Sequence, residues 1–196
     1  MGHHHARVYR EIPEIELVAV ADPIIEKAQK VSRANFTRAY ADYRELLERE
    51  RPDIVSVAVP TEEHYQVALD ALEAGCHVLV EKPITATEEK AHSLIERAAA
   101  LNRKLMVGHI VRFDPAVQEL RRRLEAGELG QVFQIRCRRV GPFPARIRDV
   151  GVVIDLATHD LDIIRYITGQ EIVRVYAETS RAIHSVHEDI LTGTVR

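Results

Sequence analysis

Apolar residues in the first half of the chain gather in short runs that are separated by segments with helical spacing. Four such runs, each bounded by proline or glycine, occupy residues 16–21, 54–59, 76–80 and 104–107. Continuous apolar runs of this length are typical of strands buried on both faces of a parallel sheet. Strands that alternate with helices predict βαβ units, so we expect an α/β fold with a parallel sheet.

The segments between these runs carry helix start and stop signals. Thr61 is placed as the N-cap of a helix that ends before Gly75, and Thr85 with Glu88 resembles a capping box. A shorter helix is expected over residues 42–50, and residues 4–10 also have a helix-like pattern.

The pattern changes after Gly108, and we place a domain boundary near His109. The expected domains are residues 1–108 and 109–196. The second should be α+β, with an open antiparallel sheet and a helix beneath it. Its expected helices are 115–126 and 152–167, the latter ending at Gly169, and its expected strands are 132–140, 173–178 and 190–195.

The composition is that of an ordinary globular protein. Of 196 residues, 46% are hydrophobic and 29% charged, and the net charge of −3 gives no general attraction to nucleic acid. The longest apolar runs are strand-sized, so no membrane span is expected. Cys76 and Cys137 fall in expected strands, and both are interpreted as buried thiols in a reducing cytoplasm. His3, His4 and His5 could be a purification tag or a metal site.

An acidic residue follows the first apolar run. Asp22 comes after Gly2 by the interval expected between a dinucleotide glycine loop and its ribose-binding acid. An acid there would accept hydrogen bonds from the ribose hydroxyls and repel a 2′-phosphate, which favours NAD over NADP. Asp22 before Pro23 is equally typical of a turn. Gly2 precedes the helix-like segment, where a phosphate would bind.

The sharpest motif is Glu81-Lys82-Pro83, at the carboxyl end of a buried run. Open α/β sheets bind their ligands at that edge. A lysine held near a reacting hydroxyl can stabilise developing alkoxide charge or move a proton. The alternative is a solvated strand end with Pro83 opening the next loop.

A second set of candidates lies beyond the domain boundary. Asp155 and His159 are four apart on an expected helix, so both should point to one face, where the carboxylate could orient the imidazole for acid/base chemistry. An exposed ion pair, with Asp160 and Asp162 as further surface charges, is the alternative. His109, Arg112 and Phe113 could line the same cleft or simply link the domains.

Together these residues resemble the Gfo/Idh/MocA oxidoreductases. The matching pieces are HHARVY, VAVADP, AVPTEEH, VLVEKPIT, MVGHIVRFDPA, GELG and VIDLATHDLDIIRYITG, in the family's order. The resemblance implies a Rossmann domain followed by a large open-faced sheet, with NAD in the cleft and hydride transfer at a sugar alcohol.

The resemblance also assigns roles. It implies that Lys82 is the catalytic lysine, His159 the acid/base and Asp155 its companion. Cofactor contacts are implied for Gly2, Asp22, Pro60, Thr61, His64, Glu81, Lys82 and Arg112, and no metal is implied. Arg146 and Arg148 could hold a nucleotide-sugar phosphate, on their charge alone. Segment VGPFPARIRDVGVVIDLATHD favours the C3 hydroxyl of UDP-N-acetylglucosamine as substrate.

Two alternatives stay open: an inositol or simple-sugar dehydrogenase, and a noncatalytic nucleotide-binding relative. A homo-oligomer formed through the C-terminal sheet and a cytoplasmic location are also expected. The family's first strand, the first glycines of its phosphate loop and its last sheet strands have no counterpart here. We therefore expect weak NAD binding and no turnover from residues 1–196 alone.

Overall fold

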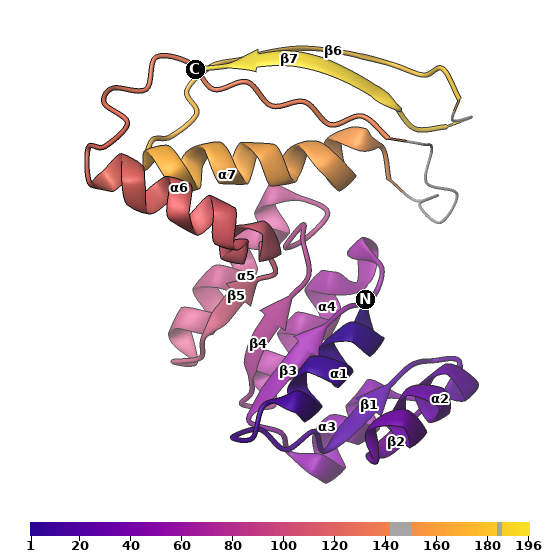
Figure 1. Cartoon of the computed structure of the whole chain (residues 1–196). Helices are drawn as coiled ribbons and strands as arrows, with labels where there is room; N and C mark the ends of the chain where they lie inside the picture. Colours follow the sequence, from indigo (N-terminus) through magenta and orange to yellow (C-terminus); the bar gives the residue numbers. More distant parts are fainter. Residues whose placement is uncertain (142–149, 184–185) are drawn as a thin grey trace. The chain divides into compact units, whose positions relative to one another are not determined.

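The structure is a computed structural model that describes residues 1–141, 150–183 and 186–196 (Figure 1). These residues form two compact units, Met1–Gly108 and His109–Arg196. Among the described residues, no helix has both the length and the apolar character that a membrane crossing requires.

The strands of the first unit all run parallel. Strand β1 (Ala19–Ala21) pairs with β2 (Arg38–Tyr40), and β4 (His77–Val80) is the middle strand between β3 (Ile54–Val57) and β5 (Leu105–Val107). The four predicted parallel strands are therefore present, each somewhat shorter than its apolar run. Within the described residues β1 and β3 do not pair with each other, so the Rossmann-type sheet is in two pieces.

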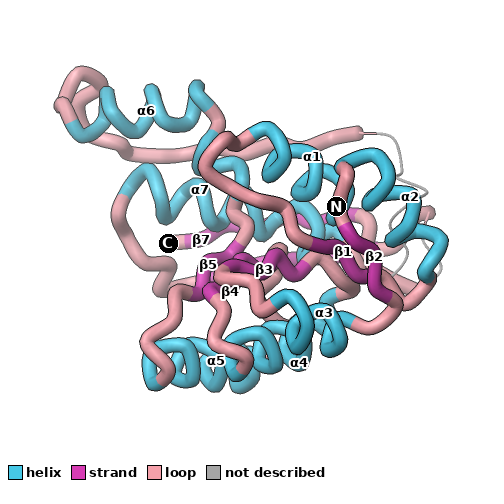
Figure 2. Tube along the Cα trace, turned by 90° about the horizontal axis from the view of Figure 1, so that it is seen from below, coloured by secondary structure: helices cyan, strands magenta, loops and turns pink. Residues whose placement is uncertain are grey.

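Helices cover both faces of these strands. Figure 2 shows two helices on one side, α1 (Gly2–Glu11) and α2 (Ile25–Asn35). On the other side lie α3 (Tyr43–Glu50), α4 (Thr61–Glu73) and α5 (Glu88–Ala100). This three-layer arrangement brings the carboxyl ends of β3, β4 and β5 to one edge, which is where the candidate residues of this unit gather.

The core of the first unit lies between β3–β4 and helices α3 to α5. Leu72, Leu94 and Val80 are fully buried, and Val57 and Cys76 are each 1% exposed. Burial raises the pKa of the Cys76 thiol, so this cysteine is a packing residue rather than a nucleophile. Val78 and Val80 place one face of β4 in this core, which helps to fix the point at which the chain leaves the sheet after Val80.

Two predicted helix starts are displaced by one or two residues. The N-cap of α4 is Pro60 rather than Thr61, and α4 has no side-chain cap. Helix α5 is capped by Thr87, whose hydroxyl accepts from the Lys90 amide. The predicted box at Thr85 is wrong because the buried Thr85 hydroxyl donates to the Thr87 carbonyl instead, 2.6 Å away.

The second unit consists of helical segments and one hairpin. Its helical segments are a 3₁₀ turn η1 (Ile110–Phe113), α6 (Pro115–Glu125), a π-helical turn η2 (Val153–Ala157) and α7 (Thr158–Thr168). Strands β6 (Val175–Ser180) and β7 (Ile190–Val195) pair antiparallel, and α7 lies beneath them in Figure 1. Gly169 ends α7 with φ of 65°, as its position predicts.

The predicted strand over residues 132–140 is wrong. The segment forms no strand, and β6 and β7 pair only with each other among the described residues. Alternating polarity cannot make a strand without a neighbour to accept its backbone hydrogen bonds. Cys137, predicted to be buried in that strand, is exposed.

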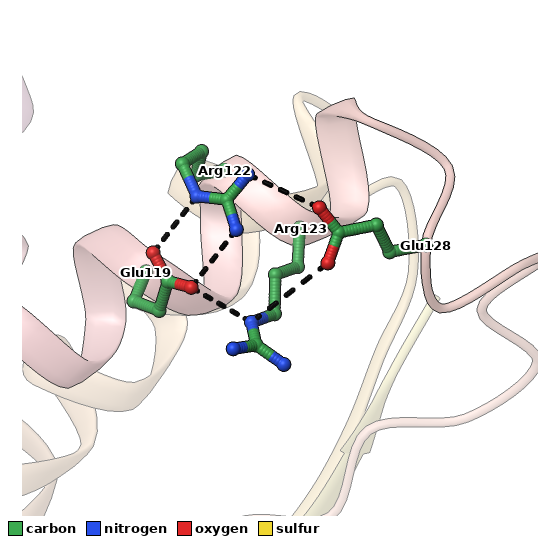
Figure 3. A network of polar contacts seen from close by, with 4 residues as sticks. All are labelled: Glu119, Arg122, Arg123 and Glu128. Atoms are coloured by element: carbon green, nitrogen blue, oxygen red, sulfur yellow. Dashed lines mark hydrogen bonds and ion pairs between the residues drawn. The ribbon is translucent and has the colours of Figure 1, made fainter.

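A network of exposed ion pairs lies at the C-terminal end of α6. Arg122 and Arg123 share Glu119 on one side and Glu128 on the other (Figure 3), with Glu119 contacts of 2.7 to 2.9 Å. Hydrogen bonds from Arg122 and Arg123 lower the pKa of Glu119 to about 2. Because all four side chains are solvent-accessible, the network fixes the helix end locally and contributes little to overall stability.

Candidate active site

The Glu81-Lys82-Pro83 motif begins where the central strand β4 ends. The Glu81 amide donates to the Val57 carbonyl at 3.0 Å, so the first residue of the motif is still held by the neighbouring strand. The peptide between Lys82 and Pro83 is cis. Lys82 therefore leaves the sheet directly after a residue that is fixed by the backbone, at the edge predicted from the sequence.

His64 connects helix α4 with this turn. Its ring is 2% exposed, with Nδ1 2.7 Å from the Pro83 carbonyl oxygen and Nε2 3.0 Å from the Val59 carbonyl oxygen. Both ring nitrogens therefore face oxygens of the protein's own backbone. This geometry indicates that His64 shapes the two loops after β3 and β4, and that its nitrogens are not directed at a ligand.

Glu81 is held by a histidine that the sequence analysis did not place in the site. Nε2 of His5, on α1, lies 2.8 Å from Oε1 of Glu81, and both side chains are more than four-fifths buried. The hydrogen bond from His5 lowers the pKa of the Glu81 carboxyl and outweighs the opposite effect of burial. On its other side Glu81 packs on Gly108, where an added Cβ would lie 3.3 Å from Oε2.

The residues expected at the adenosine end follow β1. The Asp22 amide donates to the Tyr40 carbonyl at 3.1 Å, and Oδ1 of Asp22 accepts from the Ile24 amide at 2.9 Å. Asp22 thus opens a turn and also stands at the carboxyl end of β1. Its Oδ2 has no partner among the described residues and could accept from a ribose hydroxyl.

Gly2 is the first residue of α1, which begins two residues before the helix-like segment 4–10 that the sequence predicted. An added Cβ on Gly2 would lie 4.0 Å from Cβ of Ala58, which follows β3, so the start of α1 approaches the carboxyl edge of the sheet. Amides at a helix start favour an anion such as a pyrophosphate. Helix α1 therefore begins where a dinucleotide bound across this edge would need those amides.

In the second unit, Asp155 and His159 lie on consecutive helical turns of different kinds. Asp155 is in the π-helical turn η2, and His159 is the second residue of α7. Single π turns inside helices are frequent at functional sites. The prediction that both residues belong to one helical run is confirmed, although the first turn is wider than an α-helical turn.

The start of this helical run is held by Glu188. The Glu188 carbonyl accepts from the Val152 amide at 3.0 Å, and its carboxylate accepts from the Val153 amide at 3.2 Å. An added Cβ on Gly151 would lie 2.1 Å from the Glu188 carboxyl group, so glycine is needed for this contact. Glu188, just before β7, thus occupies the amides at the start of η2.

Arg112 is paired with a buried carboxylate. Its Nε lies 2.8 Å from Oδ2 of Asp162, and its Nη2 lies 2.5 Å from Oδ1. Asp162 is 7% exposed, so its interpretation as a surface charge is wrong. Nδ1 of His109 is 3.6 Å from the same carboxylate. The pair attaches η1, at the start of the second unit, to the middle of α7.

The predicted residues therefore gather in two groups. The first unit holds Gly2, Asp22, Pro60, Thr61, His64, Glu81 and Lys82 at or near the carboxyl ends of its strands, and the second unit holds Arg112, Asp155 and His159. Sequence reasoning missed His5, Asp162 and Glu188. Arg146 and Arg148 lie outside the described residues.

These features define a class of protein. A parallel α/β unit with an acid after its first strand and a lysine after its central strand is a Rossmann-type dinucleotide-binding domain, here followed by an α+β domain. Comparison with known families agrees. Residues 1–109 match the oxidoreductase family with the NAD-binding Rossmann fold, and residues 117–196 match the GFO/IDH/MocA C-terminal domain. The chain belongs to the Gfo/Idh/MocA family of oxidoreductases, whose cofactor is NAD.

Its relatives act on sugars and inositols. UDP-N-acetylglucosamine 3-dehydrogenase of Acidithiobacillus ferrooxidans is 38% identical over 177 residues, which are 90% of this chain and 54% of that enzyme. A solved structure of that enzyme superposes with a TM-score of 0.88 at 35% identity, covering 99% of this chain and 61% of the other. The scyllo-inositol 2-dehydrogenase (NAD(+)) of Bacillus subtilis is 34% identical, over 89% of this chain and 53% of the enzyme.

A more distant structure shares the fold alone. It is scyllo-inositol dehydrogenase from Lactobacillus casei, solved with bound NAD(H) and scyllo-inositol, with a TM-score of 0.84 at 22% identity. The superposition covers 98% of this chain and 62% of the L. casei enzyme. The chain spans about half the length of the curated relatives it matches.

Proposed function

We propose that this chain carries the cofactor-binding and proton-transfer groups of an NAD-dependent dehydrogenase that acts on a secondary alcohol of a sugar or nucleotide sugar. The observation that carries the proposal is the position of Lys82. It follows the central strand β4 directly, beside a buried and paired carboxylate, at the edge of the sheet where α/β proteins bind their ligands.

The residues of the first unit fit a dinucleotide. Asp22 offers Oδ2 to the adenosine ribose, and the amides at the start of α1 offer donors to the pyrophosphate. Pro60 and Thr61 open α4 at the same edge, while His64 holds the loop that leads to Lys82. When bound, NAD supplies the acceptor for the hydride.

The reaction needs one further group, which takes the hydroxyl proton. Oxidation of a secondary alcohol to a ketone removes a hydride, for which NAD would be the acceptor, and the hydroxyl proton, for which the protein would supply the base. Lys82 would stabilise the developing alkoxide, and His159 would accept the proton. Asp155 would orient the His159 ring and favour its charged form. The products are the keto sugar, NADH and a protonated side chain.

The C3 hydroxyl of UDP-N-acetylglucosamine is the substrate that we propose, because the relative at 38% identity is named for that reaction. An inositol or a simple sugar is the second candidate, favoured by the relative at 34% identity. A noncatalytic nucleotide-binding role would leave no task for both Lys82 and His159. We also propose a cytoplasmic homo-oligomer assembled through the C-terminal sheet, because all six residues of β6, Val175 to Ser180, are exposed to solvent in the single chain.

The test uses residues 1–196 and an extended chain that carries the remaining segments of the A. ferrooxidans relative. NAD reduction is followed with UDP-N-acetylglucosamine, scyllo-inositol and myo-inositol, and NAD binding by calorimetry. We expect micromolar NAD binding and turnover of the nucleotide sugar by the extended chain only, because α1 alone does not supply a glycine turn for the pyrophosphate. Equal binding by both chains would refute that reasoning.

Lys82→Met in the extended chain should lower kcat by about a hundredfold or more while NAD binding stays within about threefold. Lys104→Met is the matched control, because Lys104 is an exposed lysine of the same unit. Near-normal turnover by the Lys82 variant would rule out its role. Turnover of an inositol but not of the nucleotide sugar would refute the proposed substrate, whereas the proposed oxidation of a secondary alcohol would stand.

A further inference from the structure

A chain of hydrogen bonds links helix α1 to the residue before Lys82. Ser56, in β3, stands between two side chains of α1, because the Tyr9 hydroxyl is hydrogen-bonded to its Oγ and Nδ1 of His5 lies 3.3 Å from the same atom. Nε2 of His5 then reaches Oε1 of Glu81 at 2.8 Å. Tyr9 follows His5 by one helical turn, and their rings meet edge to face at 6.3 Å.

The donors and acceptors in this chain can all be satisfied with a neutral imidazole. Tyr9 donates to Ser56, Ser56 donates to Nδ1 of His5, and the Nε2–H of His5 donates to the ionised Glu81. The Ser56 hydroxyl then both accepts and donates, each ring nitrogen of His5 has one partner, and the direction of the chain is fixed. Because the chain is mostly buried, an unsatisfied member would be unfavourable, which makes the arrangement specific.

The Glu81 side chain is also packed on the side away from His5. Its amide is held by the Val57 carbonyl, and the neighbouring Gly108 amide donates to the Val80 carbonyl at 2.7 Å. An added Cβ on Gly108 would lie 3.4 Å from both Cα and Cδ of Glu81, so the side chain lies flat against that glycine. The Glu81 side chain therefore packs between His5 and Gly108, while its amide is held by the Val57 carbonyl.

We propose that His5, supported by Ser56 and Tyr9, is a positioning residue that fixes Glu81 and thereby the point from which Lys82 extends. The inference rests on the proposed function. It differs from a direct cofactor contact for Glu81, because Oε1 of Glu81 is occupied by His5. It also connects the helix that would bind the pyrophosphate with the strand end that carries the lysine, so binding at one is structurally tied to geometry at the other.

Two substitutions test the roles of the two ring nitrogens of His5 separately. In His5→Gln the amide nitrogen stands as many bonds from Cα as Nε2, so donation to Glu81 is retained. In His5→Asn the amide ends where Nδ1 was, so contact with Ser56 is retained and Glu81 loses its donor. The exposed neighbour His4, changed to Asn, is the control for the loss of a histidine from α1.

We expect the extended chain with His5→Asn to lose at least about tenfold in kcat with NAD affinity within about threefold, and His5→Gln to retain most of the activity. A merely structural role for His5 would instead weaken NAD binding equally in both variants and leave kcat unchanged. That outcome, or full kcat with His5→Asn, overturns the inference. Absence of turnover by the unsubstituted extended chain overturns the proposed function, and the positioning role with it.

A spectroscopic measurement on residues 1–196 tests the contact without turnover. Nuclear magnetic resonance of the ¹⁵N-labelled imidazole should show a proton on Nε2 and none on Nδ1 near neutral pH. The ¹³C resonance of the Glu81 carboxyl should titrate below its ordinary pKa, and should move up in His5→Asn but not in His5→Gln or His4→Asn. If the pKa of the Glu81 carboxyl is the same in His5→Asn as in the unsubstituted chain, the contact between His5 and Glu81 is refuted.

Discussion

Replacing Arg112 should destabilise the second unit more than replacing its partner Asp162. The two residues form a bidentate pair, with contacts of 2.8 and 2.5 Å. The Asp162 side chain is 6% exposed, whereas that of Arg112 is 37% exposed. The consequences of losing one partner therefore differ, because water can reach the arginine but not the carboxylate.

The magnitudes follow from this asymmetry. Loss of one partner from a fully buried ion pair is destabilising by about 3–5 kcal/mol, mainly because a charge is left unpaired. Among the described residues, Arg112→Met leaves the buried carboxylate with His109, at 3.6 Å, as its remaining ion-pair partner, and we expect a loss of about 3 kcal/mol. Asp162→Asn leaves a guanidinium that water can hydrate, and retains one acceptor, so a loss of about 1 kcal/mol is expected.

A local assay is required. The chain has two units, so a single unfolding transition is not assured, and it has no tryptophan to report on one of them. Hydrogen exchange of the α7 amides, measured by mass spectrometry, gives the free energy of opening where Asp162 lies. The double variant Arg112→Met, Asp162→Leu should be more stable than Arg112→Met alone. Equal effects of the two single variants would refute the argument from burial.

Three further predictions concern other parts of the chain. Leu72→Ala removes a fully buried side chain and should lower the unfolding free energy of the first unit by about 3 kcal/mol in urea, whereas Ile95→Ala, at a site 52% exposed, should change it by less than about 1 kcal/mol. The pKa of Glu119 is lowered to about 2, so the stabilisation that Glu119 gives to α6 should be fully present above the unfolded-state pKa and should disappear as the pH falls toward 2. Circular dichroism measures the helix content over this pH range, and a Glu119→Gln variant should not show the dependence on pH. Asp22→Ser with Pro23→Arg should shift the extended chain toward NADP in steady-state kinetics, and an unsubstituted chain that already prefers NADP would contradict the role of Asp22.

Local patterns in the sequence predicted the elements that the core depends on. The apolar runs before Asp22, Pro60 and Glu81 became strands β1, β3 and β4, because proline and charged residues bound them closely. Strand β7 has the predicted bounds. Strand β2 was missed, since Arg38–Tyr40 is only three residues long and has no apolar run.

Interactions over long sequence distances could not be predicted. The alternation over residues 132–140 is a correct strand pattern, but a strand also needs a neighbour, which no local pattern specifies. His5 pairs with a residue 76 positions away, and Arg112 with one 50 positions away. The sequence did contain a signal that Asp162 is buried and paired, because it lies among apolar residues of α7, where a charge requires a partner.

Both candidate proton-transfer groups lie next to a charged residue that is buried and paired. Lys82 follows Glu81, which His5 holds, and His159 precedes by three residues Asp162, which Arg112 holds. A side chain that moves a proton must itself keep some freedom, so its position has to be fixed through its neighbours in the chain. A buried, hydrogen-bonded carboxylate suits this purpose better than an apolar contact, because few geometries satisfy its hydrogen bonds. We therefore propose that the two buried carboxylates, Glu81 and Asp162, serve to position Lys82 and His159, because a buried charge by itself adds little to folding stability.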